Sequence, residues 1–500
     1  MNNNYQKNDI ISLKIIDMAE SGEGIGKIDS LVFFVKNAVV GDYVNAIITK
    51  PTKNIIYSKT IEIIKPSPHR VNSPCEVSKY CGGCTLLNLD YDEEIKIKEN
   101  NFFKKLKTIA HLSDENINKI YKGFKKCANT LHYRNKIQLP LGPGLISGFY
   151  KKGTHDIIET SVCPVSFEGA DDIITHIKNC IKNFPIDKNK NEKLIYDENT
   201  HEGIFREIFL RTGNTSGEVC ATLIVNDKNY KEKLDIYKSL AHKIATPLST
   251  PVRANCVSPK TVTLNINLKN NNVLFGNENI ILYGNGYIED TILKTKFHIS
   301  PQSFYQVNKF MTEVLYNTAI DFIKEENIDL KNINALDLYC GIGTISLIFA
   351  PLVRHITGIE IVEEAINNAN ENKKINNILN ADFFVYNAEK LTKDFFKENY
   401  NDKNNENIGL IIVDPPRKGL TENLINTIKK LNPEYILYIS CDQGTLCRDL
   451  DLFRMSPNPV GANCVSPQNP HYTAKKIACV DMFPHTQHTE TVVLLKREND

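Results

Sequence analysis

The stretch Ala335-Leu336-Asp337-Leu338-Tyr339-Cys340-Gly341-Ile342-Gly343-Thr344 decides the fold class. An apolar strand runs into a glycine turn, and an apolar helical run follows from Ile345. This is the strand-turn-helix unit of nucleotide-binding sheets, in which glycines let a ligand approach the backbone. The unit predicts an open α/β sheet in the carboxyl-terminal half of the chain.

A second strand is expected to end at Glu360 in Gly358-Ile359-Glu360. A carboxylate there can accept hydrogen bonds from both hydroxyls of a ribose. The chain has Gly341-Ile342-Gly343 rather than the full three-glycine dinucleotide fingerprint, so no pyrophosphate grip is evident. S-adenosylmethionine, which carries a ribose and no phosphate, therefore suits the unit better than NAD. Asn387 falls near the expected third strand end, where its side chain can reach an adenine.

Two later apolar runs bring a carboxylate and a thiol to the same edge. Residues 411–413 end in Asp414-Pro415-Pro416-Arg417-Lys418-Gly419, and Tyr435 to Ile439 lead to Cys441. Open α/β sheets place their reacting groups at such carboxyl ends. A small core cysteine is the alternative for Cys441. Arg417 and Lys418 either steady a substrate or form solvated surface.

Composition describes a globular chain with no global charge signal. The 500 residues favour about three domains. A net charge of +1 means that any RNA-binding surface must be a local patch. The 13 cysteines lack the spacing of a disulfide scaffold and the first ten residues are polar, so we expect a reducing, cytoplasmic compartment. No apolar run approaches the ~18 residues of a membrane span.

The amino-terminal module, residues 1–65, reads as a small β-barrel. Its apolar runs are Ile10 to Ile16, Leu31 to Val35, Tyr43 to Ile48 and Ile61 to Ile64, separated by glycine-rich turns such as residues 21–26. Gly22-Glu23-Gly24, Phe33-Phe34-Val35, Gly41-Asp42 and the closing residues 66–70 resemble a TRAM domain, an OB-like RNA-binding barrel. Lys50, Lys53 and Lys59 are candidate phosphate contacts. A packing or oligomerisation barrel is the alternative.

Three cysteines follow within ten residues, with the spacing C-x5-C-x2-C. Cys75, Cys81 and Cys84 form a partial cage for a soft metal, and Gly82 and Gly83 let the backbone fold tightly. Cys163, followed by Pro164, is the candidate fourth ligand, because a Cys-Pro pair also closes some iron-sulfur cages. Structural zinc and simple buried cysteines are the alternatives.

Further along, residues 91–110 have the spacing of an amphipathic helix, and mixed strands and helices are expected from residue 132 to about 275. A nine-residue segment, 251–259, recurs with one substitution at 459–467. Such a sharp repeat favours a short insertion over domain duplication, so Cys256 and Cys464 are excluded from the chemistry.

Six motifs, in order over nearly the whole chain, resemble the RNA uracil-5-methyltransferases of the RumA and TrmA type. They are residues 75–84, 300–308, 336–344, 414–419, 438–450 and 481–490. The resemblance implies a class I S-adenosylmethionine-dependent methyltransferase domain over 300–500, a Rossmann-like doubly wound sheet whose last strands form an antiparallel edge. It also implies a central α+β iron-sulfur and RNA-binding domain over 66–299, after the amino-terminal barrel.

The same resemblance implies residue roles. Cys441 would be the nucleophile and Glu490 the base, with a solvated acid opening the last strand as the alternative for Glu490. The expected S-adenosylmethionine-binding residues are Gln306, Tyr339, Glu360, Asn387 and Asp414, and the expected [4Fe-4S] ligands are Cys75, Cys81, Cys84 and Cys163. Asn387 departs from the family, in which an acid is frequent, and residues 456–470 enlarge the segment between nucleophile and base.

The expected activity is formation of 5-methyluridine in 23S ribosomal RNA, with the target uridine flipped out of its stack. The barrel and the cysteine cage favour this ribosomal branch, and no stable protein partner is implied. A tRNA substrate, methylation of an exocyclic nitrogen through residues 414–417 alone, and a non-catalytic iron-sulfur RNA-binding protein are the alternatives.

Overall fold

The computed structural model describes residues 5–160, 163–187, 192–246, 258–392, 395, 408–455 and 470–498. Two compact units emerge from the internal contacts. The first unit comprises Met1–Phe102, Ser147–Pro164 and Phe483–His488, and the second comprises Phe103–Ile146, Val165–Met482 and Thr489–Asp500. The repeated segments lie almost entirely outside the described residues, and the three-domain division of the chain stays a prediction.

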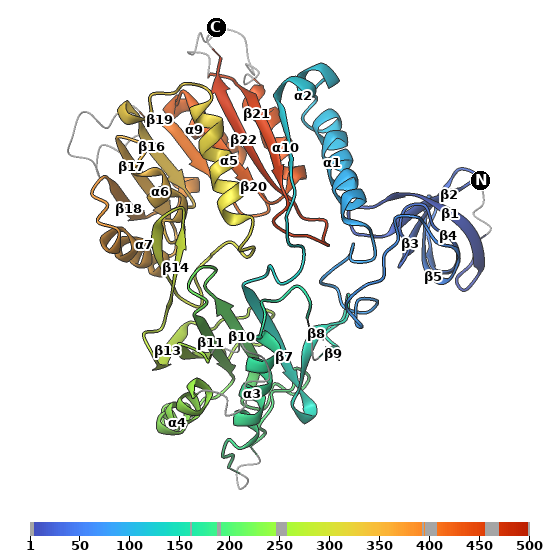
Figure 1. Cartoon of the computed structure of the whole chain (residues 1–500), viewed down its shortest axis with the longest axis vertical. Coiled ribbons are helices and arrows are strands. Elements are labelled where there is room, and N and C mark those ends of the chain that lie inside the picture. Colours follow the sequence, from blue (N-terminus) through green and yellow to red (C-terminus); the bar gives the residue numbers. More distant parts are fainter. Residues whose placement is uncertain are drawn as a thin grey trace. The chain divides into compact units, whose positions relative to one another are not determined.

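The first unit begins with a closed five-stranded barrel, drawn in dark blue in Figure 1. Alternate side chains of its strands point inward, as the period of a half-buried strand requires, and Ile15, Phe33, Val35, Val44 and Ile56 are fully buried. The strands follow the order β1-β2-β3-β5-β4, with bounds β1 (Ile10–Met18), β2 (Gly24–Ile28), β3 (Leu31–Lys36), β4 (Tyr43–Pro51) and β5 (Ile55–Lys65).

One strand of the barrel was not predicted from the sequence because it contains glycines. The sequence predicted a turn over residues 21–26, but β2 begins at Gly24. A Cβ at Gly24 would lie 2.7 Å from Ile15 Cγ2, and one at Gly26 would lie 2.6 Å from Leu13 Cδ1. These glycines therefore serve the close packing of β2 on β1 rather than a turn.

The rest of the first unit is a cysteine-containing loop, the start of helix α1 (Tyr91–Thr108) and the hairpin of β8 (Ile146–Tyr150) and β9 (Ile157–Glu159). The helix predicted at 91–110 is confirmed. Its buried Glu94 and Lys98 form an ion pair of 2.7 Å. Glu94 also accepts a hydrogen bond from the His485 amide at 2.8 Å, which fastens residues 483–488 to this unit.

The second unit contains a mixed sheet in which five strands follow the order β13-β12-β11-β10-β7. Strand β11 is buried along its whole length, and β10 along all but one residue. The elements are β7 (Lys136–Gly142), β10 (Phe205–Thr212), β11 (Val219–Val225), β12 (Thr261–Ile266), β13 (Glu278–Tyr283), α3 (Ala170–Lys182) and α4 (Leu234–Ala245), followed by the hairpin β14 (Ile288–Ile292) and β15 (Thr295–Ile299).

The second unit also contains an eight-stranded sheet of order β18-β17-β16-β19-β20-β22-β21-β6. Its strands are β16 (Asn334–Leu338), β17 (His355–Glu360), β18 (Ala381–Val385), β19 (Ile408–Val413), β20 (Tyr435–Ser440), β21 (Tyr472–Val480), β22 (Glu490–Arg497) and β6 (Tyr121–Lys125). Strands β16 and β20 are buried throughout, because helices flank the sheet (Figure 1). The helices are α2 (Asp114–Ile120), α5 (Thr312–Lys324), α6 (Thr344–Phe349), α7 (Glu363–Ile375), α9 (Glu422–Leu431) and α10 (Gln443–Arg454).

The predicted fold class is confirmed, with one difference at the edge of the sheet. The first five strands in this order run parallel and β22 and β21 pair antiparallel, as expected. The edge strand itself is β6, which pairs parallel with β21 and comes from far earlier in the chain. Among the described residues, every helix is too short or too polar to cross a membrane.

Candidate active site

The candidate site lies in the second unit, where the order of the eight-stranded sheet reverses between β16 and β19. Strand β17 ends at Glu360, and Tyr339, Asp414 and Cys441 directly follow β16, β19 and β20. Carboxyl ends of parallel strands meet at one edge, and ligands of doubly wound sheets bind there.

Strand register brings Cys441 and Glu490 together. Strand β20 pairs antiparallel with β22, and Ser440 faces Thr491. Cys441 and Glu490 directly adjoin this last pair, and the Glu490 carboxyl is near enough to raise the pKa of the Cys441 thiol. Residues directly opposite on antiparallel strands are neighbours, with Cβ atoms about 5 Å apart. The thiol and the carboxyl expected to act together thus lie side by side.

Burial and neighbouring carboxyls raise the pKa values of the groups in this site. Burial, then the carboxyls of Glu490 and Asp414, raise the pKa of the Cys441 thiol to about 12, while Arg417 lowers it. Burial and Asp414 raise the pKa of Glu490 well above its usual range, and Arg417 again opposes the shift. Burial raises the pKa of Asp414 to about 7. A cation in this site would favour the thiolate and both carboxylates.

Glu360 lies against the glycine turn. Its Oε2 accepts a hydrogen bond from the Gly341 amide at 3.3 Å, and its Oε1 accepts from the amides of Ile361 and Val362. A Cβ added at Gly341 would meet nothing within 4 Å, so the space beside this carboxylate is open. Gly343 has φ +79° and its Cβ position lies 2.9 Å from the Phe383 ring, so only glycine fits there without strain.

Tyr339 and Asn387 are joined to the site through a residue that sequence reasoning did not assign. The Tyr339 hydroxyl donates to Glu389 Oε1 at 2.8 Å, and Tyr339 has φ +67°. Glu389 also accepts from the Thr421 hydroxyl. Asn387 Oδ1 accepts from the Glu389 amide at 2.9 Å, so its amide nitrogen is the group left to meet a ligand. The sequence feature that could have pointed to Glu389 is its position two residues after Asn387.

Gln306 reaches the site through Tyr316 of α5, a second residue missed in the sequence. The Tyr316 ring is 3% exposed and its hydroxyl hydrogen-bonds the Gln306 side chain. Burial, then the carboxyls of Asp414, Glu490 and Asp337, raise the pKa of Tyr316 well above its usual range. Gln306 and three carboxyls therefore all act on one buried phenol. No sequence signal separates this tyrosine from an ordinary core residue.

The loop over residues 417–420 is clasped to helix α10. Arg448 donates to the carbonyls of Lys418 at 3.1 Å and Leu420 at 2.9 Å. Asp449 accepts from the Leu420 amide at 2.8 Å and from the Tyr438 hydroxyl at 2.7 Å. These bonds fix the backbone that carries Arg417, whose charge favours the anionic forms of Cys441 and Glu490.

The predicted cluster ligands lie in the first unit, all four half-buried. Burial, then the nearby Cys163, raises the pKa of Cys75, and burial, then Cys163 and Cys75, raises that of Cys81. Three of the thiols are thus near enough to influence one another. Within the described parts of the chain, however, no three His, Cys, Asp or Glu side chains are grouped closely enough to hold a metal ion.

The strand order, the glycine turn and the acid at the end of β17 together define a class I S-adenosylmethionine-dependent methyltransferase fold. A family model described as tRNA (Uracil-5-)-methyltransferase matches residues 277–498. An uncharacterized RNA methyltransferase of Bacillus cereus is 34% identical, with 98% of this chain and 97% of the relative covered. Another from Clostridium acetobutylicum is 36% identical, with 98% of each chain covered.

The fold is also that of a solved structure. The tRNA (uracil-54, C5)-methyltransferase of Pyrococcus abyssi, in complex with S-adenosyl-L-homocysteine, superposes with a TM-score of 0.67 at 22% identity, covering 97% of this chain and 100% of that one. The sequence relatives establish that this chain belongs to the RNA methyltransferases, and its residues 277–498 match the uracil-5 family model.

Proposed function

We propose that the protein transfers a methyl group from S-adenosylmethionine to carbon 5 of a uridine in 23S ribosomal RNA. Cys441 is the nucleophile and Glu490 the base. The observation that carries the proposal is the position of these two residues next to the last pair of the β20–β22 ladder, where the Glu490 and Asp414 carboxyls both influence the Cys441 thiol.

Carbon 5 of uracil is too weak a nucleophile to take a methyl group directly. Addition of the Cys441 thiolate to carbon 6 makes the ring an enolate. Its carbon 5 then attacks the methyl group of the donor, the methyl–sulfur bond breaks, and S-adenosyl-L-homocysteine leaves. The thiolate leaves again once the proton on carbon 5 has been removed. Covalent catalysis of this kind splits one hard step into easier ones.

Glu490 removes that proton. Its raised pKa makes its carboxylate a stronger base than an exposed glutamate, which suits proton abstraction near neutral pH. The Asp414 carboxyl contributes to the raised pKa of Glu490, because two close carboxyls do not ionise together readily. Arg417 opposes both shifts and so helps the thiolate and the carboxylate to form.

The methyl donor supplies an electrophilic methyl group on a sulfonium. We propose that Glu360 binds its ribose hydroxyls beside the open face of Gly341 and that the amide of Asn387 meets the adenine. Asp414, Gln306 and Tyr339 complete this donor site. Binding of labelled donor to Glu360→Gln should weaken at least about tenfold, because one bidentate contact is lost.

Ribosomal RNA is proposed because of the barrel and the cysteine loop of the first unit. The competing candidate is tRNA, which the description of the matching family model names. Incubation with labelled S-adenosylmethionine and either unmodified RNA, followed by nucleoside analysis, separates them. Label in 5-methyluridine of ribosomal RNA supports the proposal. Label in tRNA alone keeps the chemistry and overturns the substrate.

We propose further that Cys75, Cys81, Cys84 and Cys163 hold a [4Fe-4S] cluster. Three of the four thiols are near enough to influence one another's pKa, which supports this proposal. In the described residues the four thiols are not grouped as metal ligands. No step of the proposed methyl transfer requires the cluster. Anaerobically purified protein should contain iron and sulfide that the Cys81→Ser variant lacks, whereas stoichiometric zinc would replace the assignment.

A further inference from the structure

Glu389 joins two loops of the second unit that serve different parts of the proposed reaction. It belongs to the short 3₁₀ helix η4 (Ala388–Lys390), which follows strand β18. One of its carboxylate oxygens accepts a hydrogen bond from the Tyr339 hydroxyl at 2.8 Å, and the other accepts from the Thr421 hydroxyl. A single side chain therefore connects the loop after β16 with the loop after β19.

The backbone of Glu389 is itself held in place. Its amide donates to Asn387 Oδ1 at 2.9 Å, and its carbonyl accepts from Asn423 Nδ2 at 3.2 Å. The residue is half-buried between these contacts. The two backbone hydrogen bonds fix where the side chain begins, and the two hydroxyl donors fix where it ends.

Tyr339 keeps an unusual backbone conformation beside this carboxylate. Its φ of +67° is left-handed, which a bulky residue adopts rarely and keeps only where its surroundings enforce it. Burial, then the hydrogen bond to Glu389 and the charges of Glu389, Asp449 and Glu360, raise the pKa of the phenol, so it keeps its proton. The Tyr339 hydroxyl is thus a fixed donor to Glu389, close to the acid proposed to bind the ribose of the methyl donor.

Thr421 ends the loop of residues 417–421, which we call the Arg417 loop. Its hydroxyl donates to Glu389 and accepts from the Leu424 amide at 3.2 Å, as the cap of helix α9. The preceding residue, Leu420, is bonded to helix α10 through both its amide and its carbonyl. The end of the Arg417 loop is therefore attached to α10 at one residue and to η4 at the next.

A carboxylate suits this position better than an amide does. Both hydroxyls donate, and an ionised carboxylate offers an acceptor oxygen to each, whereas a glutamine side chain offers one acceptor and one donor group. Hydrogen bonds to an ionised group are also about twice as strong as those between neutral groups. A glutamine at position 389 would therefore weaken both contacts and oppose one of them.

We propose that Glu389 is a positioning residue that couples the methyl-donor site to the Arg417 loop. Through Tyr339 it orders the donor site, and through Thr421 it holds the loop that carries Arg417. The inference rests on the proposed function in taking Tyr339 as a donor-binding residue and Cys441 as the nucleophile that Arg417 assists. Substitution of Glu389 should therefore impair donor binding and turnover together.

The first test is the affinity of the full-length protein for S-adenosyl-L-homocysteine, measured by calorimetry without RNA. Glu389→Gln should weaken binding at least about fivefold, because the Tyr339 hydroxyl loses a charged acceptor. Glu422→Gln is the matched control, since it makes the same change of charge at an exposed residue next to Thr421, and it should bind like the wild type. Tyr339→Phe removes the same hydrogen bond from its other end, so it measures the contact independently of any misfolding of Glu389→Gln.

The double variant Tyr339→Phe/Glu389→Gln tests whether the two residues act as a pair. Because both substitutions remove one hydrogen bond, the double variant should bind at most about twofold more weakly than the weaker single variant. Independent roles would multiply the two losses instead. Multiplied losses, or wild-type affinity of Glu389→Gln, would overturn the inference.

The second test addresses the Arg417 loop through steady-state methyl transfer to unmodified RNA. Thr421→Val should lower kcat at least about fivefold, because the loop loses its attachment to Glu389, while the KM for S-adenosylmethionine changes by less than about twofold. Thr421→Ser keeps the donor and should restore kcat. Thr421→Asp can still cap α9 but, when ionised, cannot donate to Glu389, so it should be as slow as Thr421→Val.

Equal kcat in Thr421→Ser and Thr421→Asp would overturn the coupling to the Arg417 loop, because the cap alone would then explain the role of Thr421. The proposed function fails separately. Wild-type protein that makes no 5-methyluridine, yet binds S-adenosyl-L-homocysteine and loses this affinity with Glu389→Gln, would overturn the reaction and support the positioning of the donor site by Glu389.

Discussion

At the scale of single residues, the site sets a thiol and two carboxyls against one another. Burial raises the pKa of all three groups, the two carboxyls further raise that of the thiol, and Asp414 further raises that of Glu490. These shifts favour the neutral forms of the nucleophile and the base. Arg417 is a cation of the chain itself that favours their ionisation. The chemistry of the site thus depends on charge balance as much as on the identity of the thiol.

Replacement of the nucleophile gives the first prediction. Cys441→Ala should reduce methyl transfer to background and prevent any covalent RNA adduct, because no other group can add to carbon 6. The control is Cys447→Ala, a buried cysteine of α10. Its loss should cost little stability and leave methyl transfer within about threefold of wild type. Nucleoside analysis of the RNA measures both, and methylation by Cys441→Ala would favour attack from an exocyclic nitrogen.

Asp337 gives a prediction about pH. Its carboxyl is fully buried, and burial raises its pKa from 3.8 to about 7, although the Ser346 hydroxyl, donating at 2.5 Å, opposes the shift. Folded protein therefore keeps this proton over a pH range in which the unfolded chain has lost it. The stabilisation is complete below pH ~4 and is lost as pH rises toward ~7. Asp337→Asn lacks this titration.

Urea unfolding at pH 4.5 and pH 7.5 measures the effect. The free energy of unfolding of the wild type, relative to Asp337→Asn, should fall from pH 4.5 to pH 7.5 by as much as roughly 3 kcal/mol. The same difference at both pH values would mean that Asp337 is ionised in the folded protein.

At the scale of elements, two contacts position the reacting groups. The pairing of β20 with β22 ends at Ser440 and Thr491, the neighbours of Cys441 and Glu490 in the chain. The clasp from α10 fixes the loop that carries Arg417, and it needs a glycine: at Gly419, φ is +71° and a Cβ would lie 2.7 Å from both Arg448 Nη2 and Asp449 Oδ2.

Gly419→Ala should therefore lower methyl transfer at least about tenfold, by displacing the clasp. Gly144→Ala is the matched control, because Gly144 has φ +76° but no atom within 4 Å of its Cβ position. Both variants pay the strain of a left-handed residue, about 1–2 kcal/mol. Only Gly419→Ala should change kcat. Equal kcat in the two variants would show that the clasp does not act on the reaction.

Many of these secondary-structure elements could be predicted from the sequence. The apolar runs before Asp414 and Cys441 and the glycine turn after Leu338 carry local signals, so β16, β19 and β20 were predicted. Strand β2 was missed because Gly24 and Gly26, present for packing, look like a turn. Strand β6 was missed because its partner β21 lies more than three hundred residues away. Pairing between distant strands leaves no local pattern.

The residues of the candidate site likewise divide into those that the sequence predicted and those that it did not. Cys441, Glu490, Glu360 and Asp414 stand in local motifs next to strand ends. Tyr316 and Glu389 act through tertiary contacts, and a buried tyrosine on an apolar helix face has no sequence signature of its own. Roles assigned by resemblance alone, such as the cluster ligands, stay predictions.

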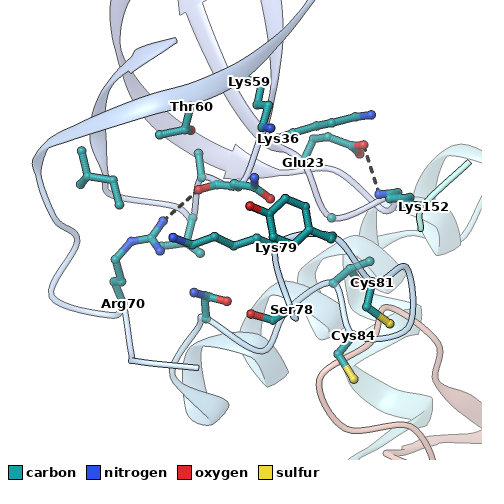
Figure 2. A pocket seen from close by; sticks show the side chains of 18 of the residues that line it. Glu23, Lys36, Lys59, Thr60, Arg70, Ser78, Lys79, Cys81, Cys84 and Lys152 are labelled. Atoms are coloured by element: carbon teal, nitrogen blue, oxygen red, sulfur yellow. Dashed lines mark hydrogen bonds and ion pairs between the residues drawn. The ribbon is translucent and has the colours of Figure 1, made fainter. Parts of the chain in front are cut away.

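At the scale of the molecule, the two units carry different parts of the proposed work. The second unit holds every residue proposed for donor binding and methyl transfer. The first unit holds the barrel and the cysteine loop, which Figure 2 shows from close by.

The central claim is covalent catalysis by Cys441 with Glu490 as the base, and Glu490→Gln tests it most directly. Incubated with labelled S-adenosylmethionine and unmodified RNA, this variant should transfer the methyl group and then stall, because the proton on carbon 5 stays in place. A labelled RNA–protein adduct that survives denaturing electrophoresis, and is absent from Cys441→Ala/Glu490→Gln, is the predicted result. Release of free 5-methyluridine at the wild-type rate would contradict the account.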